Sequence, residues 1–222
     1  STDLPGPGGT MFTGSIIFTS GFNTFPSPGA FQSSFNGGYS SNLPTDMLIM
    51  KFDAGGEKAE FATYLGGKLN DFPHSLYSDP AGNLVIMGRS YSKDFPTRPA
   101  NNVVGTSADN CDIVVAKLNA DGTDMIGGVR IGGKNDDGVN ISDLFMNGQY
   151  RRQSLIQNYG DESRSEVVLD ASQNIYVASS TQSTDFPTTV PSSLFAGKRS
   201  EEHTSESVTL EFVCRLLLEK KK

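Results

Sequence analysis

The strongest constraint on the fold of this chain is an internal repeat. The segment DMLIMKFD at Asp46–Asp53 recurs as DIVVAKLN at Asp112–Asn119, 66 residues later. Tyr64–Gly67 (YLGG) and Arg130–Gly133 (RIGG) share this displacement. A repeat of this length indicates that one supersecondary unit is copied along the chain and that each copy packs against the next.

A second repeated unit follows the first at a different spacing. The segment DPAGNLVIM at Asp79–Met87 returns as DASQNIYVA at Asp170–Ala178, 91 residues later, and Asp94–Pro96 and Asp185–Pro187 (both DFP) share this displacement. The two displacements differ by 25 residues, so the later copy carries an insertion. We expect it at about residues 145–166, because insertions in repeat arrays form loops on one face.

Each repeat predicts roughly four strands. Apolar runs such as Met47–Met50 and Ile113–Ala116 are typical of strands buried on both faces, whereas the alternating Glu60–Leu65 indicates a strand with one solvated face. Four-stranded antiparallel units repeated radially define a β-propeller. We therefore predict an all-β fold, a partial β-propeller of about three blades that form an incomplete ring. The repeat elements lie near residues 11–67, 68–133 and 134–198.

The repeated motifs resemble those of the bacterial SBBP β-propeller repeat family. They stand at Pro28–Gln32, Tyr64–Gly67, Asp79–Ile86, Ser92–Pro96 and Asp112–Gly122. The later copy of the third motif departs from the pattern, with Gln173 where the motif has glycine.

The resemblance implies a secreted or cell-surface bacterial repeat protein with no catalytic residues to carry over. We expect a structural or binding role towards a protein or glycan partner, outside the cell or on its surface. The alternative is that the chain is a fragment of a larger extracellular enzyme, whose active site lies in blades or domains outside this sequence.

Charge and hydropathy exclude two classes of partner. The formal net charge is −7, and binding to nucleic acid or to an anionic membrane needs a clustered basic surface. The longest apolar runs have four to six residues, far fewer than the ~20 that span a bilayer. We expect no nucleic-acid partner and no transmembrane segment.

The C-terminal segment, residues 199–222, breaks every repeated pattern. Its beginning at Arg199–Glu206 and its end at Val213–Lys222 are similar to the translation of a sequencing-adapter read. We therefore expect a non-native tail over residues 199–222 and a native chain that continues into the next repeated strand. The alternative is a native amphipathic helix.

The insertion holds the candidate binding residues. Tyr150, Arg151, Arg152 and Tyr159 lie in it, and tyrosine and arginine are enriched among the residues that dominate binding energy at interfaces. These four residues form a possible partner-binding loop. The alternative is a solvated loop without a partner.

Residues that could perform catalysis or hold a metal are few. His74 is the only histidine before the tail, so this chain provides neither a Ser-His-Asp triad nor a His-rich metal site. Cys111 lacks a neighbouring base and is interpreted as a thiol that is either buried or at the edge of a loop. Asp136-Asp137 and Asn119–Asp124 have compositions typical of turns, with calcium binding as the alternative. We predict no enzyme activity and no cofactor, and calcium remains possible.

Two further motifs are interpreted as structural. Gly66-Gly67 and Gly132-Gly133 precede no helical pattern, so they are predicted to be blade turns rather than phosphate-binding loops. Phe95-Pro96 and Phe186-Pro187 are predicted to wedge between blades, because a buried phenylalanine contributes about 2 kcal/mol.

Overall fold

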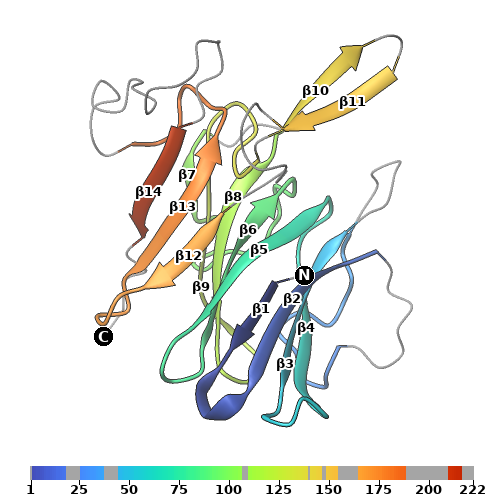
Figure 1. Cartoon of the computed structure of the whole chain (residues 1–222), viewed down its shortest axis with the longest axis vertical. Helices are drawn as coiled ribbons and strands as arrows, with labels where there is room; N and C mark the ends of the chain where they lie inside the picture. Colours follow the sequence, from blue (N-terminus) through green and yellow to red (C-terminus); the bar gives the residue numbers. More distant parts are fainter. Residues whose placement is uncertain are drawn as a thin grey trace.

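The computed structural model confirms the all-β prediction (Figure 1). It describes residues 2–18, 26–37, 45–106, 110–139, 141–146, 149–154, 165–188 and 210–216. Within these ranges the chain forms strands and turns, with a single 3-10 turn at Pro7–Gly9 and no α-helix. No helix of the described part is therefore long and apolar enough to cross a membrane.

The first sheet is a complete four-stranded blade, blade 1. It consists of β1 (Thr2–Pro5), β2 (Met11–Ile17), β3 (Asp46–Phe52) and β4 (Ala59–Leu65). The four strands pair antiparallel in sequence order, β1-β2-β3-β4.

Blade 2 repeats this arrangement with β5 (Asp71–Ser78), β6 (Leu84–Ser90), β8 (Asp112–Leu118) and β9 (Met125–Gly132). A short strand, β7 (Val103–Gly105), pairs parallel to β9 and so covers the outer edge of this blade. The spacing of 66 residues between the two copies is thus the spacing between their third strands, β3 and β8.

Blade 3 has three strands in the described part: β12 (Glu166–Leu169), β13 (Ile175–Thr181) and β14 (Leu210–Leu216). β14 lies in the tail and pairs antiparallel with β13, in the place that β3 and β8 hold in the other blades. These tail residues therefore form a strand rather than a helix. A separate hairpin pairs β10 (Ile141–Met146) with β11 (Gln149–Ser154).

The blades pack face to face, as expected for a partial β-propeller. The first strand of blade 2, β5, contacts the first strands of both neighbours, β1 and β12, whereas β4 and β9 are the fourth strands of their blades. The cluster between blades 1 and 2 contains Phe12, Met47, Ile49, Phe61, Leu65, Leu76, Leu84, Ile86, Phe95, Val114, Ala116, Leu118 and Met125. The cluster between blades 2 and 3 contains Val85, Met87, Ile113, Val115, Val129, Ile131, Val167, Ile175 and Val177.

The two-sided packing explains the apolar runs of the central strands. Met47 and Ile49 belong to the cluster between blades 1 and 2, whereas Leu48 belongs to a third cluster on the opposite face of blade 1. In β8, Val114 likewise belongs to the cluster between blades 1 and 2, and Val115 to the cluster between blades 2 and 3. A strand buried on both faces needs apolar residues at every position, not at alternate ones.

The predicted aromatic wedges are confirmed. Phe95 is 4% exposed and belongs to the cluster between blades 1 and 2. Phe186 packs against the cluster between blades 2 and 3. The repeated Asp-Phe-Pro motif therefore places one phenylalanine at each of the two interfaces between blades.

The outer edges of blades 1 and 2 are covered by the chain that connects their second and third strands. The Ser27 N–H donates to the Ala62 carbonyl on β4 (2.9 Å). In blade 2, Arg98 and Gly128 exchange backbone hydrogen bonds of 3.2 and 3.0 Å at the edge of β9. Covered edges cannot pair with another chain, so these segments oppose aggregation.

Aspartate and asparagine side chains fix the hairpin turns. Asp79 Oδ1 accepts from the Ala81 and Asn83 N–H groups (3.0 and 2.9 Å), and Asn119 Oδ1 accepts from the Thr123 and Asp124 N–H groups (2.9 and 3.1 Å). The hairpin interpretation of residues 119–124 is thereby confirmed.

Gln173 occupies a backbone conformation that explains the glycine of its motif. Its φ is 65°, and the glycine at the matching position in blade 2, Gly82, has a φ of 83°. A left-handed φ is strained for residues with a Cβ. The turn in blade 2 thus has glycine, which this conformation favours. The turn in blade 3 adopts the same conformation with glutamine.

Candidate functional site

The predicted partner-binding residues lie on or beyond the hairpin. Tyr150, Arg151 and Arg152 belong to β11, where their backbone partners on β10 are Phe145, Leu144 and Asp143. Tyr159 lies outside the described residues. The β10–β11 hairpin projects from the sheets at one end of the molecule (Figure 1).

The insertion opens the innermost strand of blade 3. Blade 2 matches blade 3 with a displacement of 66 up to Val139, which corresponds to Pro73, and with a displacement of 91 from Ser165, which corresponds to His74. Residues 140–164, rather than the expected 145–166, therefore stand between two positions that are adjacent in blade 2. The hairpin thus begins directly after the position that corresponds to Pro73 in the innermost strand of blade 2.

A buried aspartate fastens blade 1 to blade 2. Asp71 accepts hydrogen bonds from the Gly67 N–H (2.8 Å), from the Ser92 hydroxyl (2.9 Å) and from the Ser90 hydroxyl. Gly67 follows the last strand of blade 1, and the two serines follow or end the second strand of blade 2. We call these four residues the Asp71 latch.

The same arrangement fastens blade 2 to blade 3. Asp137 accepts from the Gly133 N–H (2.7 Å), from the Ser183 hydroxyl (2.9 Å) and from the Thr181 hydroxyl. We call these four residues the Asp137 latch. The two latches derive from the repeats, since their aspartates are 66 residues apart and their hydroxyl residues 91 residues apart.

The Gly-Gly pairs lie in connections between blades, where they allow close approach rather than a tight hairpin turn. A Cβ on Gly66 would stand 2.5 Å from Asp46 Oδ1 and 2.7 Å from Asp71 Oδ2. One on Gly132 would overlap Asp112 Oδ1 and lie 3.0 Å from Asp137 Oδ2. Each first glycine therefore lies between two buried carboxyl groups, where no side chain fits.

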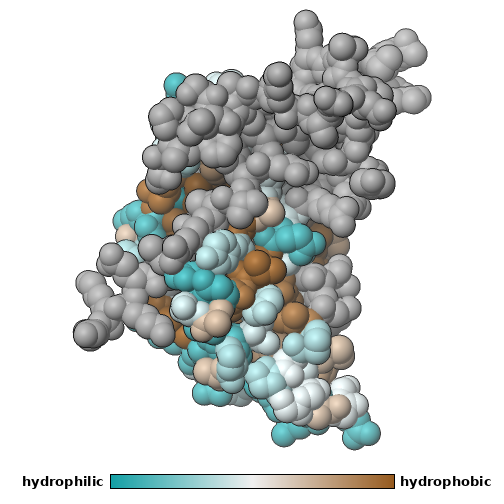
Figure 2. All heavy atoms as spheres, turned by 60° about the vertical axis from the view of Figure 1, so that its left-hand side comes forward, coloured by the Kyte–Doolittle hydropathy of each residue, from teal (hydrophilic) through white to brown (hydrophobic). Residues whose placement is uncertain are grey.

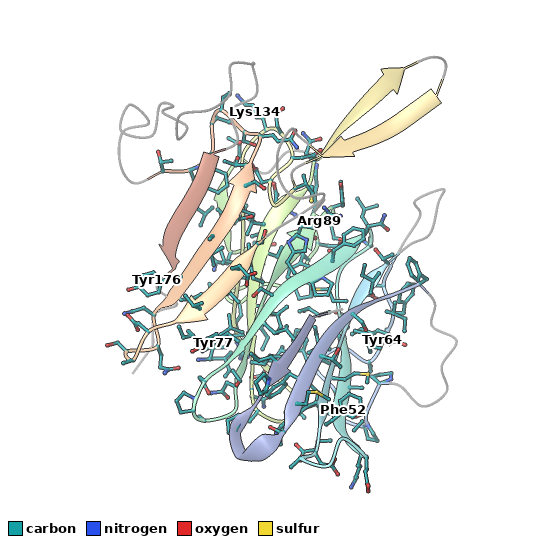
Figure 3. The ribbon with its side chains drawn as sticks, in the orientation of Figure 1. Phe52, Tyr64, Tyr77, Arg89, Lys134 and Tyr176 are labelled. Carbon is teal, nitrogen blue, oxygen red and sulfur yellow. The ribbon has the colours of Figure 1, made fainter. Side chains whose placement is uncertain are left out.

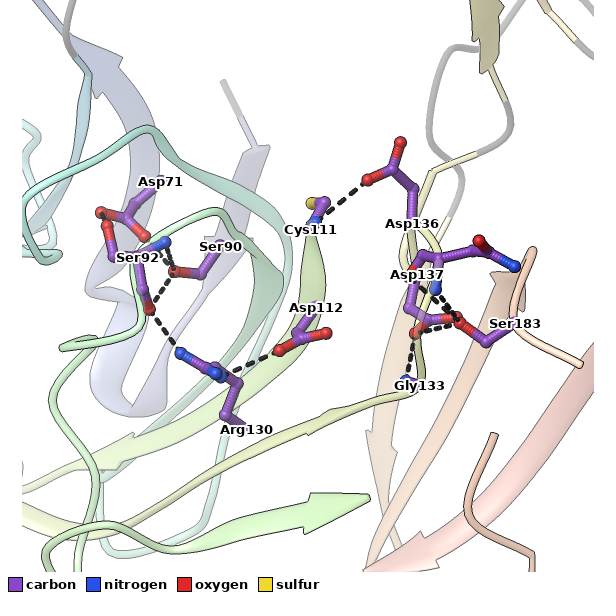
Figure 4. Close-up of polar contacts among 11 residues, drawn as sticks. Asp71, Ser90, Ser92, Cys111, Asp112, Arg130, Gly133, Asp136, Asp137 and Ser183 are labelled. Carbon is purple, nitrogen blue, oxygen red and sulfur yellow. Dashed lines mark hydrogen bonds and ion pairs between the residues drawn. The ribbon is translucent and has the colours of Figure 1, made fainter. Parts of the chain in front are cut away.

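The two pairs of carboxyl groups, Asp46 with Asp71 and Asp112 with Asp137, have different neighbouring side chains. Asp112 forms a buried ion pair with Arg130 (2.9 Å), and Arg130 Nη1 also donates to the Ser92 carbonyl (2.8 Å). Arg130 therefore joins the Asp71 latch to Asp112 across blade 2 (Figure 4). In blade 1 the position of Arg130 is held by Tyr64, so no cation stands at that place beside Asp46.

Burial dominates the ionisation of these carboxyl groups. Desolvation raises the pKa of Asp71 from 3.8 to about 7, although three hydrogen bonds to the carboxylate oppose this shift. Desolvation likewise raises the pKa of Asp46 to about 6, with Asp94 adding a like charge. The pKa of Asp137 is raised for the same first cause.

The Asp71 latch should weaken as pH rises. Folded Asp71 keeps its proton up to about pH 7, whereas the unfolded chain releases it near pH 4. Its contribution to stability is therefore full below about pH 4 and is lost towards pH 7. We expect the free energy of unfolding of the protein, relative to that of Asp71→Asn, to fall between these limits by up to about 1.4 kcal/mol per pH unit.

Urea denaturation of both proteins across this range measures the difference. The comparison with Asp71→Asn is needed because His74 has the opposite effect: burial lowers its pKa from 6.5 to about 3, so its contribution to stability rises with pH. Parallel stability curves for the two proteins would contradict the assignment.

The remaining sequence candidates have structural contacts. Asp136 accepts from the Cys111 N–H (3.0 Å), and Cys111 is buried, which raises the pKa of its thiol. Within the described ranges, no three His, Cys, Asp or Glu side chains form a group that could hold a metal ion. Asp136 and Asp137 thus stand beside each other in sequence but belong to separate contacts.

The stacked antiparallel blades and their repeated latches define this part of the chain as a β-propeller repeat array. Residues 60–96 match the family model of SBBP, described as a beta-propeller repeat. The matched segment runs from β4 through β5 and β6 to the buried Phe95 and includes the whole Asp71 latch. Comparison with curated proteins finds no match to the chain.

Sequence reasoning missed the latch donors, although a signal for them was present. GGKLND at 66–71 and GGKNDD at 132–137 repeat with the first displacement. Ser90 and Ser92 correspond to Thr181 and Ser183 with the second. Polar residues that repeat at both spacings indicate a contact between segments, but only the structure shows that the segments meet.

Proposed function

We propose that the chain is part of a non-catalytic, secreted or cell-surface protein that binds a protein or glycan partner through the ring face bearing the β10–β11 hairpin. The observation that carries the proposal is the position of the insertion. It opens the innermost strand of blade 3 and leaves the first two strands of blade 3 in the same register as those of blade 2. A segment added at that place serves a role other than packing the blades.

The composition of the hairpin supports binding. β11 has the sequence QYRRQS, and tyrosine and arginine dominate interface hot spots. Large apolar residues also stay exposed on the blades, among them Val168 (51%) and Ile126 (48%). Figure 2 shows apolar residues at the surface of the described part, between hydrophilic ones. Single exposed apolar residues are normal on protein surfaces, so the support comes from the tyrosine and arginines of β11.

A deletion that restores the blade 2 connection tests the proposal. Removing residues 140–164 joins Val139 to Ser165, as Pro73 joins His74 in blade 2. We expect this variant to keep the melting temperature of the full chain within a few degrees and to lose binding. Binding is measured on an array of oligosaccharides and by titration of the best ligand found there.

Point variants refine the same test. Arg151→Ala and Arg152→Ala should each weaken binding about 10-fold or more, the effect of losing a hot spot worth at least 1.4 kcal/mol. Lys58→Ala is the control, because Lys58 is exposed in the β3–β4 turn at the other end of the molecule (Figure 1). Binding that survives the deletion, or that falls equally in the control, contradicts the proposal.

A further inference from the structure

A buried cationic side chain, Arg89, lies on the face of blade 2 towards blade 3 (Figure 3). Arg89 on β6 is 7% exposed, and its Nε and Nη1 atoms are buried with no hydrogen-bond acceptor among the described residues. Its guanidinium carbon stands 4.5 Å from the ring centroid of Phe72, on the neighbouring strand β5. One face of the guanidinium is thus covered by an aromatic ring, and two nitrogen atoms at its edge have no partner.

His74 lies beside this arginine and is also without a partner. It occupies the β-bulge between Pro73 and Ser75 on the innermost strand β5. Neither of its ring nitrogens has a hydrogen-bond partner among the described residues, although both are buried. Burial and the charge of Arg89 lower its pKa to about 3, so the ring is neutral at pH 7 and provides one N–H donor.

The fold does not require an arginine at this position. The cross-strand pairs Arg89–Ile113, Ile16–Met47 and Ser180–Glu211 place Ile16 of blade 1 and Ser180 of blade 3 at the equivalent sites. A buried charge without a paired acceptor costs several kcal/mol. The repeated blade structure therefore does not explain why position 89 is an arginine.

The side chains around Arg89 border the surface through two residues of the innermost strand. Phe72 and His74 are only partly buried, and both belong to the innermost strand. On the blade 3 side, Gly138 lies against the stem of Arg89, where a Cβ would stand 3.2 Å from Arg89 Cβ. Arg89, His74 and Phe72 thus form a small polar and aromatic cluster, which we call the Arg89 cluster. Gly138, which contacts it, lies two residues before the insertion.

We propose that the Arg89 cluster binds a carboxylate anion of a small organic acid, either free or as the acid group of a sugar. The guanidinium Nε and Nη1 and the neutral imidazole N–H are the donors, and Phe72 covers the guanidinium face. The inference does not depend on the hairpin having a partner.

Charge selects a carboxylate over a phosphate. The cluster has one positive charge, since His74 is neutral, and a carboxylate brings one negative charge. A phosphate dianion would leave one negative charge buried without a counter-charge, which is unfavourable. A phosphate monoanion would bury two O–H donors, for which the cluster has only the unprotonated nitrogen of His74 as an acceptor. Charge-assisted hydrogen bonds from arginine to carboxylate are among the strong ones in proteins.

The test is a titration of the full chain with acetate against chloride at equal ionic strength near pH 7. Saturating acetate, at about 100 times its Kd, should raise the melting temperature by roughly 5 to 10 °C. Ring NMR signals of His74, assigned by comparison with His74→Gln, should shift with the same midpoint. Glucuronate that binds more tightly than acetate identifies an acid sugar as the source, and equal affinity identifies the free acid.

Arg89→Ile and Arg89→Ser place the residues of blades 1 and 3 at this position. Both variants should lose the acetate effect, and without acetate Arg89→Ile should melt at or above the temperature of the parent protein. Absence of an acetate effect in the parent protein, an equal effect in Arg89→Ile, or a tighter response to phosphate than to acetate would overturn the proposal. The His74 signals test it in the unaltered protein, whatever the stability of the variants.

Discussion

Replacing Arg130 by methionine should lower the free energy of unfolding by about 3 to 5 kcal/mol. Methionine reaches about as far as arginine Nε, so the packing of the apolar stem is kept and only the guanidinium end is lost. The substitution removes the ion pair to Asp112, which is 1% exposed, and the hydrogen bond to the Ser92 carbonyl. A carboxylate that is buried without its cation is costly, whereas the buried pair is close to neutral.

Chemical denaturation of three variants checks this expectation. Lys134→Met removes an exposed pair, with 3.7 Å between Lys134 Nζ and Asp185 Oδ2, and should cost less than about 1 kcal/mol. The double variant Asp112→Asn with Arg130→Met should recover much of the loss, since no buried charge remains unpaired. A loss in Arg130→Met no larger than that of Lys134→Met would show that the ion pair contributes little.

Gly132→Ala should destabilise the protein by more than about 3 kcal/mol, a cost above the usual range for overpacking because a buried polar contact is displaced as well. The added Cβ would overlap Asp112 Oδ1 and lie 3.0 Å from Asp137 Oδ2. Asp112 or the connection between blades must then move, and either movement disturbs the ion pair or the Asp137 latch.

Gly55→Ala is the matched control for this substitution. Gly55 lies in the exposed β3–β4 turn, and a Cβ added there would have its nearest neighbouring atom 3.6 Å away. Thermal and urea unfolding should place this variant within about 0.5 kcal/mol of the parent protein. Equal effects of the two substitutions would refute the close approach of the carboxyl groups to Gly132.

Much of the architecture could be predicted because it is written in repeated local patterns. The apolar runs at Met47–Met50 and Ile113–Ala116 identified central strands, since two-sided burial requires apolar residues at every position. Turn chemistry identified the hairpin at 119–124. The Asp-Phe-Pro motifs identified interface phenylalanines, because a repeated large aromatic residue needs a repeated place to be buried.

The contacts between blades could not be predicted in the same way. Gly66-Gly67 was interpreted as a turn, but its glycines have no positive φ and instead allow carboxyl groups from distant segments to approach. Asp71 receives donors from positions 67, 90 and 92, which only the folded blades bring together. Arg89 has no counterpart in the other repeats, and nothing in its neighbours in sequence indicates that its nitrogen atoms are buried.

The opening in the innermost strand of blade 3 allows the inserted segment to change independently of the core. Val139 and Ser165 hold the positions of two bonded neighbours in blade 2, so the ends of the intervening segment are already close together. The entropy of closing a loop grows slowly with its length, by about 0.6 kcal/mol for each doubling. Segments of many lengths and sequences can therefore be exchanged at this point at small cost in stability and without repacking the blades.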